Sequence, residues 1–529
     1  MRDFHNPQRS PIYAANAAIA TSHPVATEAG LAVLKRGGNA VDAGVTAAAV
    51  LAVVEPAMTA LGGDGFALIA APGKPLYGLN SSGRAAAALS TDMLMGLGWT
   101  EMDVASPHSV TVPGVVKCWE SLLASHGTIG LDAALQPAIR AAEDGFPLYP
   151  RVWTDWVECE AKLTAQGAGG QHYLVDGRAP RMGSIHRLPA LVETLKVIAK
   201  QGAKGFYEGA VAADIVAELR ARGGVMTEED MAGISADPCA PVMSGYRGID
   251  VAELPPNGVG IIAQVILNLM ERFDLSGLDP HGAERLHLEM EASRIGYAIR
   301  DAHIGDPDTL LATPEALIDK AWAKGLAATI DPKQRNLDLP PTDPTFTSDT
   351  IYLSCVDRDG MAVSLINSIF KGFGSGIVTE KTGITLQNRG AGFRVAPGHP
   401  NTIEGGKRPL HTIIPAMALE GGRPKYCFGV MGGQYQPAGH THVITNMMDY
   451  GMDPQAALDS GRVFWNPEGV IEVEPPLGQA VYDGLAAKGH PVGWTASPHG
   501  GGQIIEMDHD AGVLIAGSDP RKDGCAMGY

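Results

Sequence analysis

The sequence predicts a globular protein that combines α-helices with β-strands. Hydrophobic residues make up 45% of its 529 positions, an ordinary share for a chain with a packed core. Residues 351–356 and 361–368 form two β-prone runs, and the Asp-Gly pair between them favours a tight turn, so this stretch predicts a hairpin. Residues 24–36 and 40–54 predict helices, which makes the fold class α/β or α+β.

Start and stop signals support these first two helices. Pro24 stands in the first turn of one, a Gly-Gly pair ends it, and Asn39 can cap the next. The segment 40–54 is rich in alanine and valine on most faces, which predicts a buried helix. Gly62-Gly-Asp-Gly65 predicts a tight turn into a strand, and close backbone packing is the favoured interpretation of its glycines. Further helices are expected at 132–144, 188–203, 207–222, 259–272 and 281–303.

Charge, cysteine content and the first residues restrict the class of protein. The formal net charge is −18 with only 40 Lys and Arg residues, and these form no basic stripe, so no nucleic-acid partner is expected. The six cysteines are scattered, which predicts neither a disulfide framework nor a cysteine zinc site. The N-terminal residues lack the apolar core of a signal peptide, and the longest apolar stretch, 43–54, is too short to span a bilayer. We therefore expect a soluble, cytoplasmic protein without a membrane partner.

Two local patterns resemble ligand sites but favour other interpretations. His287 and Glu291 share a predicted helix face, which is a spacing compatible with a pair of metal ligands. The surrounding sequence offers no third ligand, so a satisfied structural network is the preferred interpretation and we assign no metal. The glycine-rich segment 371–376 lacks the Gly-Lys-Ser/Thr ending of a phosphate-binding loop. No cofactor is predicted.

Thr350 stands where a turn-rich segment meets the first strand of the predicted hairpin. Pro340, Pro341 and Pro344 exclude a helix before it, and residues 331–349 are expected to form a loop. A cut before Thr350 would place a free α-amine, with an unperturbed pKa of about 7.7–8.0, beside the hydroxyl of the same residue. An amine that activates its own hydroxyl is the catalytic unit of an N-terminal-nucleophile hydrolase. A threonine at a strand start is more often only a β-former, and spacing alone does not decide between the two.

A set of short motifs spans nearly the whole chain. Its members are Ala20-Thr-Ser-His-Pro24, Glu28-Ala-Gly30, Gly37-Gly-Asn-Ala-Val-Asp-Ala43, Val54-Glu-Pro56, Gly62-Gly-Asp-Gly-Phe66, Val112-Pro-Gly114, Pro255-Pro-Asn-Gly258, Gly305-Asp-Pro307, Asp349-Thr350, Val356-Asp-Arg-Asp-Gly360, Phe373-Gly-Ser-Gly376, Lys407-Arg-Pro409 and Gly429-Val-Met-Gly-Gly433. In these motifs and their order the chain resembles the γ-glutamyltransferase (γ-glutamyl transpeptidase) family.

The resemblance implies a four-layer αββα sandwich and a proenzyme that cuts itself before a threonine. Here the cut would fall between Asp349 and Thr350. It would give a large fragment, 1–349, and a small fragment, 350–529, intertwined in one αββα domain. The two fragments would stay associated, and a dimer of such pairs is an open alternative.

The resemblance also implies roles for individual residues. In the proenzyme the Thr350 hydroxyl would attack the carbonyl of Asp349, an ester would form as the peptide bond breaks, and water would then hydrolyse that ester and leave Thr350 with the new α-amine. In the cut enzyme Thr350 would attack the substrate amide, Ser368 would orient its amine, and Gly432 and Gly433 would present backbone N–H groups to the oxyanion. Plainer interpretations remain open, namely a strand-end serine at 368 and an ordinary turn at the glycine pair.

Departures from the family pattern carry the expectation about the substrate. Where γ-glutamyl enzymes hold asparagine, glutamine and aspartate around the glutamate head group, this chain has Phe370, Arg389 and Gly392, and His411-Thr412 replace two serines. Without the aspartate, an α-ammonium group has no evident partner, and burying an unpaired charge is costly. The arginine, and the histidine if protonated, add positive donors that suit a carboxylate.

Arg84 is a further candidate for binding a carboxylate. The family places an arginine in this region, but its position corresponds to Ser82, two residues earlier, and a surface arginine is an equal alternative. The predicted substrate-binding residues are therefore Arg84, Arg389, His411 and Thr412.

The favoured function is the hydrolysis of an amide of a small carboxylic acid, oxamate-like or glutaryl-like, through an acyl-enzyme on Thr350. This is similar to the cytoplasmic oxamate amidohydrolase-like and acylase-like branch of the family. One alternative is a γ-glutamyltransferase or glutathione hydrolase, and an alternative of another class is an unprocessed, non-catalytic scaffold or binding protein.

Overall fold

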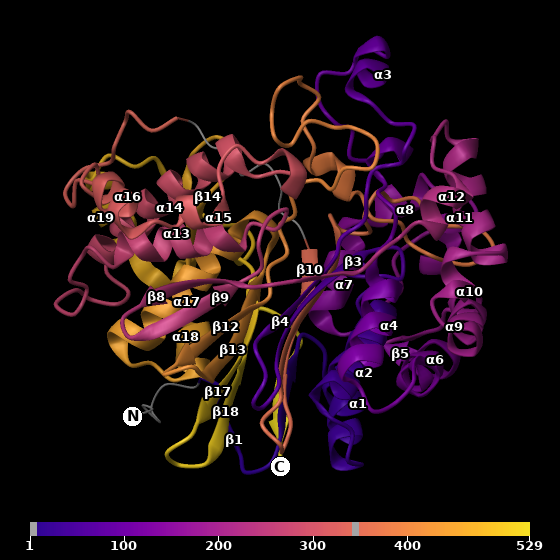
Figure 1. The fold of residues 1–529 in the computed structure, drawn as a ribbon, viewed down its shortest axis with the longest axis horizontal. Helices are drawn as coiled ribbons and strands as arrows, with labels where there is room; N and C mark the ends of the chain where they lie inside the picture. Colours follow the sequence, from indigo (N-terminus) through magenta and orange to yellow (C-terminus); the bar gives the residue numbers. More distant parts are fainter. Residues whose placement is uncertain (1–7, 341–348) are drawn as a thin grey trace.

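Two seven-stranded antiparallel sheets form the centre of the protein, in a computed structural model that describes residues 8–340 and 349–529 (Figure 1). The strand order of the first sheet is β1 (Ile12–Ala14), β18 (Val513–Ser518), β17 (Gly501–Asp508), β13 (Arg423–Met431), β12 (Ala416–Glu420), β9 (Ile249–Glu253) and β8 (Val242–Tyr246). The order of the second sheet is β19 (Cys525–Gly528), β2 (Ala18–Thr21), β10 (Asp349–Val356), β11 (Ala362–Phe370), β3 (Asp64–Ala70), β4 (Tyr77–Ser81) and β7 (Asp237–Cys239).

Helices cover the outer face of each sheet, as Figure 1 shows for the second sheet on the right and the first on the left. The second sheet is covered by α1 (Pro24–Lys35), α2 (Ala40–Val54), α4 (Val115–His126), α6 (Gln136–Asp144), α9 (Pro189–Gln201) and α11 (Ala210–Ala221). The first sheet is covered by α13 (Gly260–Met270), α14 (Ala283–His303), α16 (Lys320–Ala327), α17 (Gln436–Tyr450), α18 (Pro454–Asp459) and α19 (Gly478–Ala487). The predicted αββα sandwich is confirmed.

Shorter elements lie around these four layers. The helices among them are α3 (Thr91–Gly96), α5 (Leu131–Ala134), α7 (Pro150–Glu158), α8 (Glu160–Thr164), α10 (Lys204–Tyr207), α12 (Glu228–Ala232) and α15 (Pro314–Leu317). The strands form two small sheets, β5 (Phe146–Pro147) with β6 (Ile185–His186), and β14 (Val463–Trp465), β15 (Ile471–Val473) and β16 (Val492–Trp494). Within the described ranges, no helix is both long and apolar enough to cross a membrane.

Successive side chains of β10 point alternately into two hydrophobic cores, so this strand is buried on both faces. Tyr352 points into the core between the sheets, with Met417 and Ile505 of the first sheet, whereas Ile351 and Leu353 pack against the outer helices. Successive side chains of a strand point to opposite faces, so a central strand of a sandwich must be apolar at nearly every position. This is the physical reason for the β-prone run recognised in the sequence.

The predicted hairpin and the first two helices are confirmed, with small changes at their ends. β10 and β11 pair antiparallel, and Asn39 caps α2 by accepting a hydrogen bond from the Asp42 N–H at 3.0 Å. The helix expected at 132–144 is instead two helices, α5 and α6. The second helix carries Pro137 in its first turn, and a proline cannot donate the hydrogen bond that would continue the first.

Both sheets combine strands from before and after residue 350. In the second sheet β10 and β11 lie between β2 and β3, and in the first sheet β12 lies between β9 and β13. Residues 331–340 of the predicted loop contain no helix or strand, residues 341–348 lie outside the described ranges, and β10 begins at Asp349. The predicted fragments 1–349 and 350–529 are therefore interleaved in each sheet.

Candidate active site

Thr350 lies near the start of β10, opposite an irregularity in β11. Asp349 pairs with Phe370 and Ile351 pairs with Asn367, so two residues of β11 face Thr350 alone. Such a bulge redirects side chains next to it and interrupts the ladder of backbone hydrogen bonds. The Thr350 side chain is buried, and its Oγ1 donates a hydrogen bond to Ser368 Oγ at 3.2 Å.

Ser368 connects Thr350 to a buried arginine. Its Oγ lies 3.1 Å from Arg389 Nη2, which donates to it, and it also accepts a hydrogen bond from the Phe370 N–H at 2.8 Å. Three donors therefore converge on this hydroxyl oxygen and hold it in place. The structure brings together the residue predicted to be the nucleophile and the residue predicted to orient it.

Arg389 is fully buried in a short 3-10 helix, Arg389–Gly392. Its Nη1 donates to Thr412 Oγ1 at 2.9 Å, and its guanidinium lies 4.2 Å from the centre of the Phe370 ring. Burial lowers the pKa of this guanidinium to about 9, partly opposed by the charge of Asp64. Within the described ranges its Nε has no hydrogen-bond partner and no carboxylate lies in ion-pair contact with it. The site thus contains a buried cation to which no carboxylate of the described residues is directly bound.

Asp64 organises the backbone around this site, although its glycine-rich turn predicted only close packing. Its Oδ1 accepts hydrogen bonds from the N–H groups of Gly83 and Gly114 at 2.9 and 3.1 Å and from Gln387 Nε2 at 2.9 Å. Burial raises the pKa of this carboxyl to about 6. The three hydrogen bonds and the positive charge of Arg389 oppose this rise. Asp64 pairs in register with Ser368, which explains why its charge acts on Arg389.

His411 differs from its expected role as a positive donor to the substrate. Its Nε2 faces Asp64 Oδ2 at 3.1 Å, and its ring is completely buried. Burial, with the charges of Arg389 and Arg408, lowers the pKa of His411 well below the usual value, so the ring is neutral at pH 7. Its neighbour Thr412 points the other way, toward Arg389.

Arg84 is not brought to Thr350. Its Nη1 donates to the carbonyl of Gly406 at 2.9 Å, and its Nη2 lies 3.8 Å from Asp237 Oδ2. The side chain is 41% exposed and lines a separate cavity of about 170 Å³. This placement matches a surface arginine that holds a loop.

Gly432 and Gly433 directly follow β13. Their φ angles are 132° and 58°, conformations that side-chain-bearing residues rarely adopt. In the described part of the chain neither N–H donates to a protein acceptor. Gly432 lines the same cavity as Thr350, which is the location expected of an oxyanion donor.

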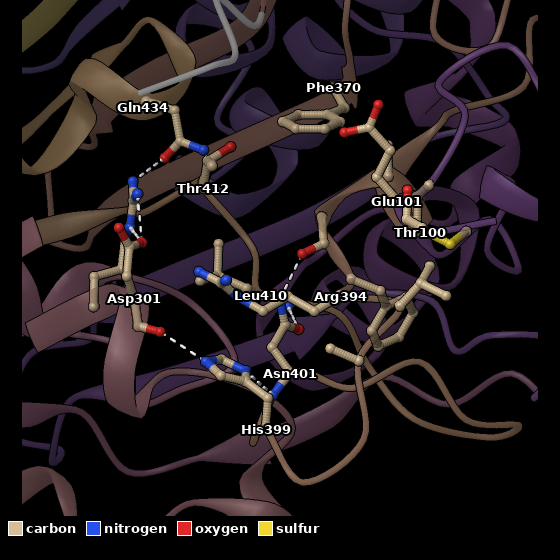
Figure 2. Close-up of a pocket in the computed structure, with 17 residues that line it drawn as sticks. Thr100, Glu101, Asp301, Phe370, Arg394, His399, Asn401, Leu410, Thr412 and Gln434 are labelled. Atoms are coloured by element: carbon tan, nitrogen blue, oxygen red, sulfur yellow. Dashed lines mark hydrogen bonds and ion pairs between the residues drawn. The ribbon is translucent and has the colours of Figure 1, made fainter. Parts of the chain in front are cut away.

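Two cavities border the residues of this site. One, of about 290 Å³, is lined by Phe370, Gly392, Thr412 and Gln434, as Figure 2 shows for the labelled members of this set. The other, of about 510 Å³, is lined by Thr350 and Gly432 and shares Gln434 with the first. Gln434 therefore lies at the border of both cavities, next to the glycine pair.

Several residues of the first cavity were not identified from the sequence. Arg394 and His399 add basic groups, Glu101 and Asp301 add carboxylates, and Gln434 accepts a short hydrogen bond from Arg300. Gln434 directly follows the glycine pair, so its position in the chain was the available signal. The others come from loops whose approach depends on the tertiary fold.

Comparison with known proteins agrees with this arrangement. Residues 26–529 match the family model described as gamma-glutamyltranspeptidase. The glutathione hydrolase-like YwrD proenzyme of Bacillus subtilis is 36% identical over 520 residues, covering 96% of this chain and 98% of the relative. The oxamate amidohydrolase proenzyme of Klebsiella pneumoniae is 34% identical over 529 residues, covering 96% and 97%.

A solved structure extends the agreement to three dimensions. The cephalosporin acylase from Bacillus halodurans superposes with a TM-score of 0.92 at 35% identity, covering 100% of this chain and 99% of the other. Fold, order of motifs and curated relatives thus agree over nearly the full length, and the protein is an enzyme. The chain belongs to the gamma-glutamyltranspeptidase family of N-terminal-nucleophile hydrolases.

Proposed function

We propose that this enzyme cuts its own chain between Asp349 and Thr350 and then hydrolyses an amide of a small carboxylic acid through an acyl-enzyme on Thr350. The hydrogen bond from Thr350 Oγ1 to Ser368 Oγ supports the nucleophile, and the N–H groups of Gly432 and Gly433, which donate to no acceptor of the described residues, support the oxyanion site. Fragments 1–349 and 350–529 would remain together because their strands share both sheets.

The observation that carries the proposed substrate class is the buried guanidinium of Arg389. It is held by Ser368 and Thr412 and stacked on Phe370, yet no carboxylate of the described residues is bound to it. Burying a cation is costly unless its charge is balanced, and a planar guanidinium binds a carboxylate with two parallel hydrogen bonds. The carboxylate of a bound substrate would supply that balance.

The position of Arg389 favours a short acyl group. Its Nη2 and Thr350 Oγ1 both contact the same atom, Ser368 Oγ, at 3.1 and 3.2 Å. A reacting carbonyl carbon must approach the nucleophile to about 3–3.5 Å. A carboxylate bonded directly to that carbonyl, as in oxamate, would then lie beside the guanidinium. A glutaryl chain has three additional methylenes, and its carboxylate would reach beyond Arg389, where Arg394 and His399 of the first cavity are the candidate partners.

A γ-glutamyl amide is the second candidate, because the same cavity contains carboxylates. Glu101 and Asp301 both line it, and Figure 2 shows Glu101 on the side of Phe370. Asp301 is paired with Arg300 at 2.6 Å, which leaves Glu101 as the better partner for an α-ammonium group. Glu101 is therefore a candidate partner for the α-ammonium group, for which the sequence indicated none.

An assay of the purified, processed enzyme with oxamate, a glutaryl anilide and a γ-glutamyl anilide tests the proposal. We expect the highest kcat/KM for oxamate, and we expect Glu101→Gln to leave that value unchanged. Preference for the γ-glutamyl compound, together with its loss in Glu101→Gln, would establish the second candidate. A single uncleaved band on a denaturing gel that persists on incubation would refute self-processing.

A further inference from the structure

Three potential metal ligands meet on the outer side of the first sheet. His287 and Glu291 come from α14, and His490 follows α19, whose helix packs beside α14 (Figure 1). One nitrogen or carboxylate oxygen from each residue lies within 4.8 Å of the others, and all three side chains are buried. None of the three lines either cavity of the active site.

The hydrogen bonds of His287 define which of its nitrogens can bind a metal. Its Nε2 lies 2.7 Å from the carbonyl oxygen of Asp331, and a carbonyl can only accept, so Nε2 carries the hydrogen. The lone pair of the neutral ring is then on Nδ1, which lies 2.8 Å from His490 Nε2. A ligating histidine whose other N–H donates to a backbone carbonyl is the usual arrangement in metal sites.

The two rings already point their nitrogens at each other, His287 Nδ1 at His490 Nε2. Without a metal, His490 Nε2–H donates to His287 Nδ1. With a metal, the His490 proton would move to Nδ1 of the same ring, so that both lone pairs face the ion and no net proton is released.

Glu291 completes the set with a fixed carboxylate. Its Oε1 accepts a hydrogen bond from Arg294 Nη1 at 2.7 Å, and its Oε2 accepts one from the Asn336 N–H at 2.8 Å. Each carboxylate oxygen has a second lone pair, so these contacts orient the group without exhausting its capacity. A small movement of the side chains would bring the three ligand atoms to the distances of about 2.0–2.2 Å that zinc requires.

We propose that His287, Glu291 and His490 form a site for a divalent transition-metal ion, with Zn²⁺ as the best match. Two imidazoles and a carboxylate are a known zinc ligand set, and they leave a fourth position for water. The neighbouring cations Arg294, Arg335 and Lys488 repel a metal ion, so the affinity should be lower than that of a four-ligand structural site. This proposal replaces the expectation of no metal, because the ligand missing from the local sequence arrives from residue 490.

The site would join the two parts of the chain. His287 and Glu291 precede residue 350, whereas His490 follows it. The loop that contacts them, Asp331 to Asn336, precedes the Asp349–Thr350 bond in the sequence. If the chain is cut as proposed above, the ion would connect the large and small fragments. Metal binding itself does not depend on that cut.

Zinc titration of metal-stripped protein tests the site, with calorimetry for stoichiometry, thermal unfolding for coupling to the fold, and Co²⁺ absorption for the ligand geometry. His490→Gln removes one ligand but retains an N–H donor toward His287, and Glu291→Gln removes the charge. His281→Gln is the matched control, because His281 contacts Ser460 and lies outside the cluster.

We expect one Zn²⁺ per chain and a zinc-dependent rise in Tm for the unmodified protein and the His281→Gln control. Both effects, and the visible Co²⁺ bands, should be lost in His490→Gln and Glu291→Gln. The Tm of each variant in metal-free buffer reports whether it is folded. Equal zinc binding in the unmodified protein and His490→Gln, or none in either, would show that the two histidines form only a hydrogen-bonded pair and would overturn the proposal.

Discussion

Replacing Arg389 by methionine should reduce activity without reducing stability. The guanidinium is completely buried between Phe370, Ser368 and Thr412, and methionine has a similar unbranched length and keeps the contact with the ring. If the positive charge serves the substrate, its removal leaves the substrate carboxylate buried and unpaired. Breaking such a pair typically costs about 3–5 kcal/mol, which corresponds to a loss of roughly two to three and a half orders of magnitude in kcat/KM.

The same substitution, Arg389→Met, should not lower the free energy of unfolding. Burial lowers the pKa of Arg389 from 12.5 to about 9, a difference on the order of 5 kcal/mol against the charged form in the folded state. Because the arginine is charged in both states at pH 7, this cost is present there in full. Methionine removes it and loses two hydrogen bonds worth about 1 kcal/mol each. The free energy of unfolding should therefore stay equal or rise by up to about 3 kcal/mol.

Two measurements and one matched variant test this reasoning. Urea unfolding at pH 7 would be measured in a Thr350→Ala background, so that every chain is uncut, and kcat/KM would be measured with oxamate per mole of free N-terminal threonine. Arg84→Met is the control, because this half-exposed arginine lies outside the Thr350 site. We expect no loss of activity there and a stability change within about 0.5 kcal/mol. A clear loss of stability in Arg389→Met, or equal losses of activity in the two variants, would refute a substrate-binding role for Arg389.

Three further predictions concern the nucleophile, a buried acid and a helix cap. Thr350→Ala should give a single band on a denaturing gel and no hydrolysis, whereas Thr350→Ser should still be cut, more slowly, and release a fragment with an N-terminal serine. Burial raises the pKa of Glu55 from 4.5 to about 8, opposed by Lys522 and by the hydrogen bond from Ser22, so the folded state holds this proton more tightly than the unfolded state. The contribution of Glu55 to the free energy of unfolding should then be largest below pH 4.5 and fall by up to about 1.4 kcal/mol per pH unit toward pH 8. Glu55→Gln should remove this slope in urea unfolding at pH 5 and pH 8, and an unchanged slope would exclude Glu55 as its origin. Asn39→Ala should lower the free energy of unfolding by about 1–2 kcal/mol with normal kcat/KM, because it removes the cap of α2 and the hydrogen bond to the His126 carbonyl at 2.6 Å.

Local physical signals explain how much of the fold could be predicted. The α2 helix has a cap, a uniformly apolar face and a defined end, and the β10–β11 hairpin has two β-prone runs around a turn. Each signal lies within about twenty residues of its partners, so the sequence displays it directly. The division between α5 and α6 was missed because Pro137 ends one helix but also suits the first turn of the next.

The arrangement of the active site could not be predicted from local sequence signals. The placement of Thr350, Ser368 and Gly432 in one site was expected only because the motifs resemble a family. Asp64 was interpreted as part of a packing turn, since nothing near it in the sequence indicates that Gln387 and His411 would come to its carboxylate. Burial and tertiary contact determine whether a histidine is charged or an arginine unpaired, and neither property is written in the local sequence.

The mixing of strands from both fragments within each sheet has a consequence for how the enzyme folds and how long it stays folded. While the backbone is continuous, folding is unimolecular, and β10 can find its place between β2 and β11 at any dilution. After scission before Thr350, the same rearrangement would need an encounter between two separate polypeptides, each exposing the edges of half-built sheets. The mature enzyme would therefore persist through slow unfolding rather than through reversible refolding. Its production would be a one-way sequence in which assembly must precede cutting.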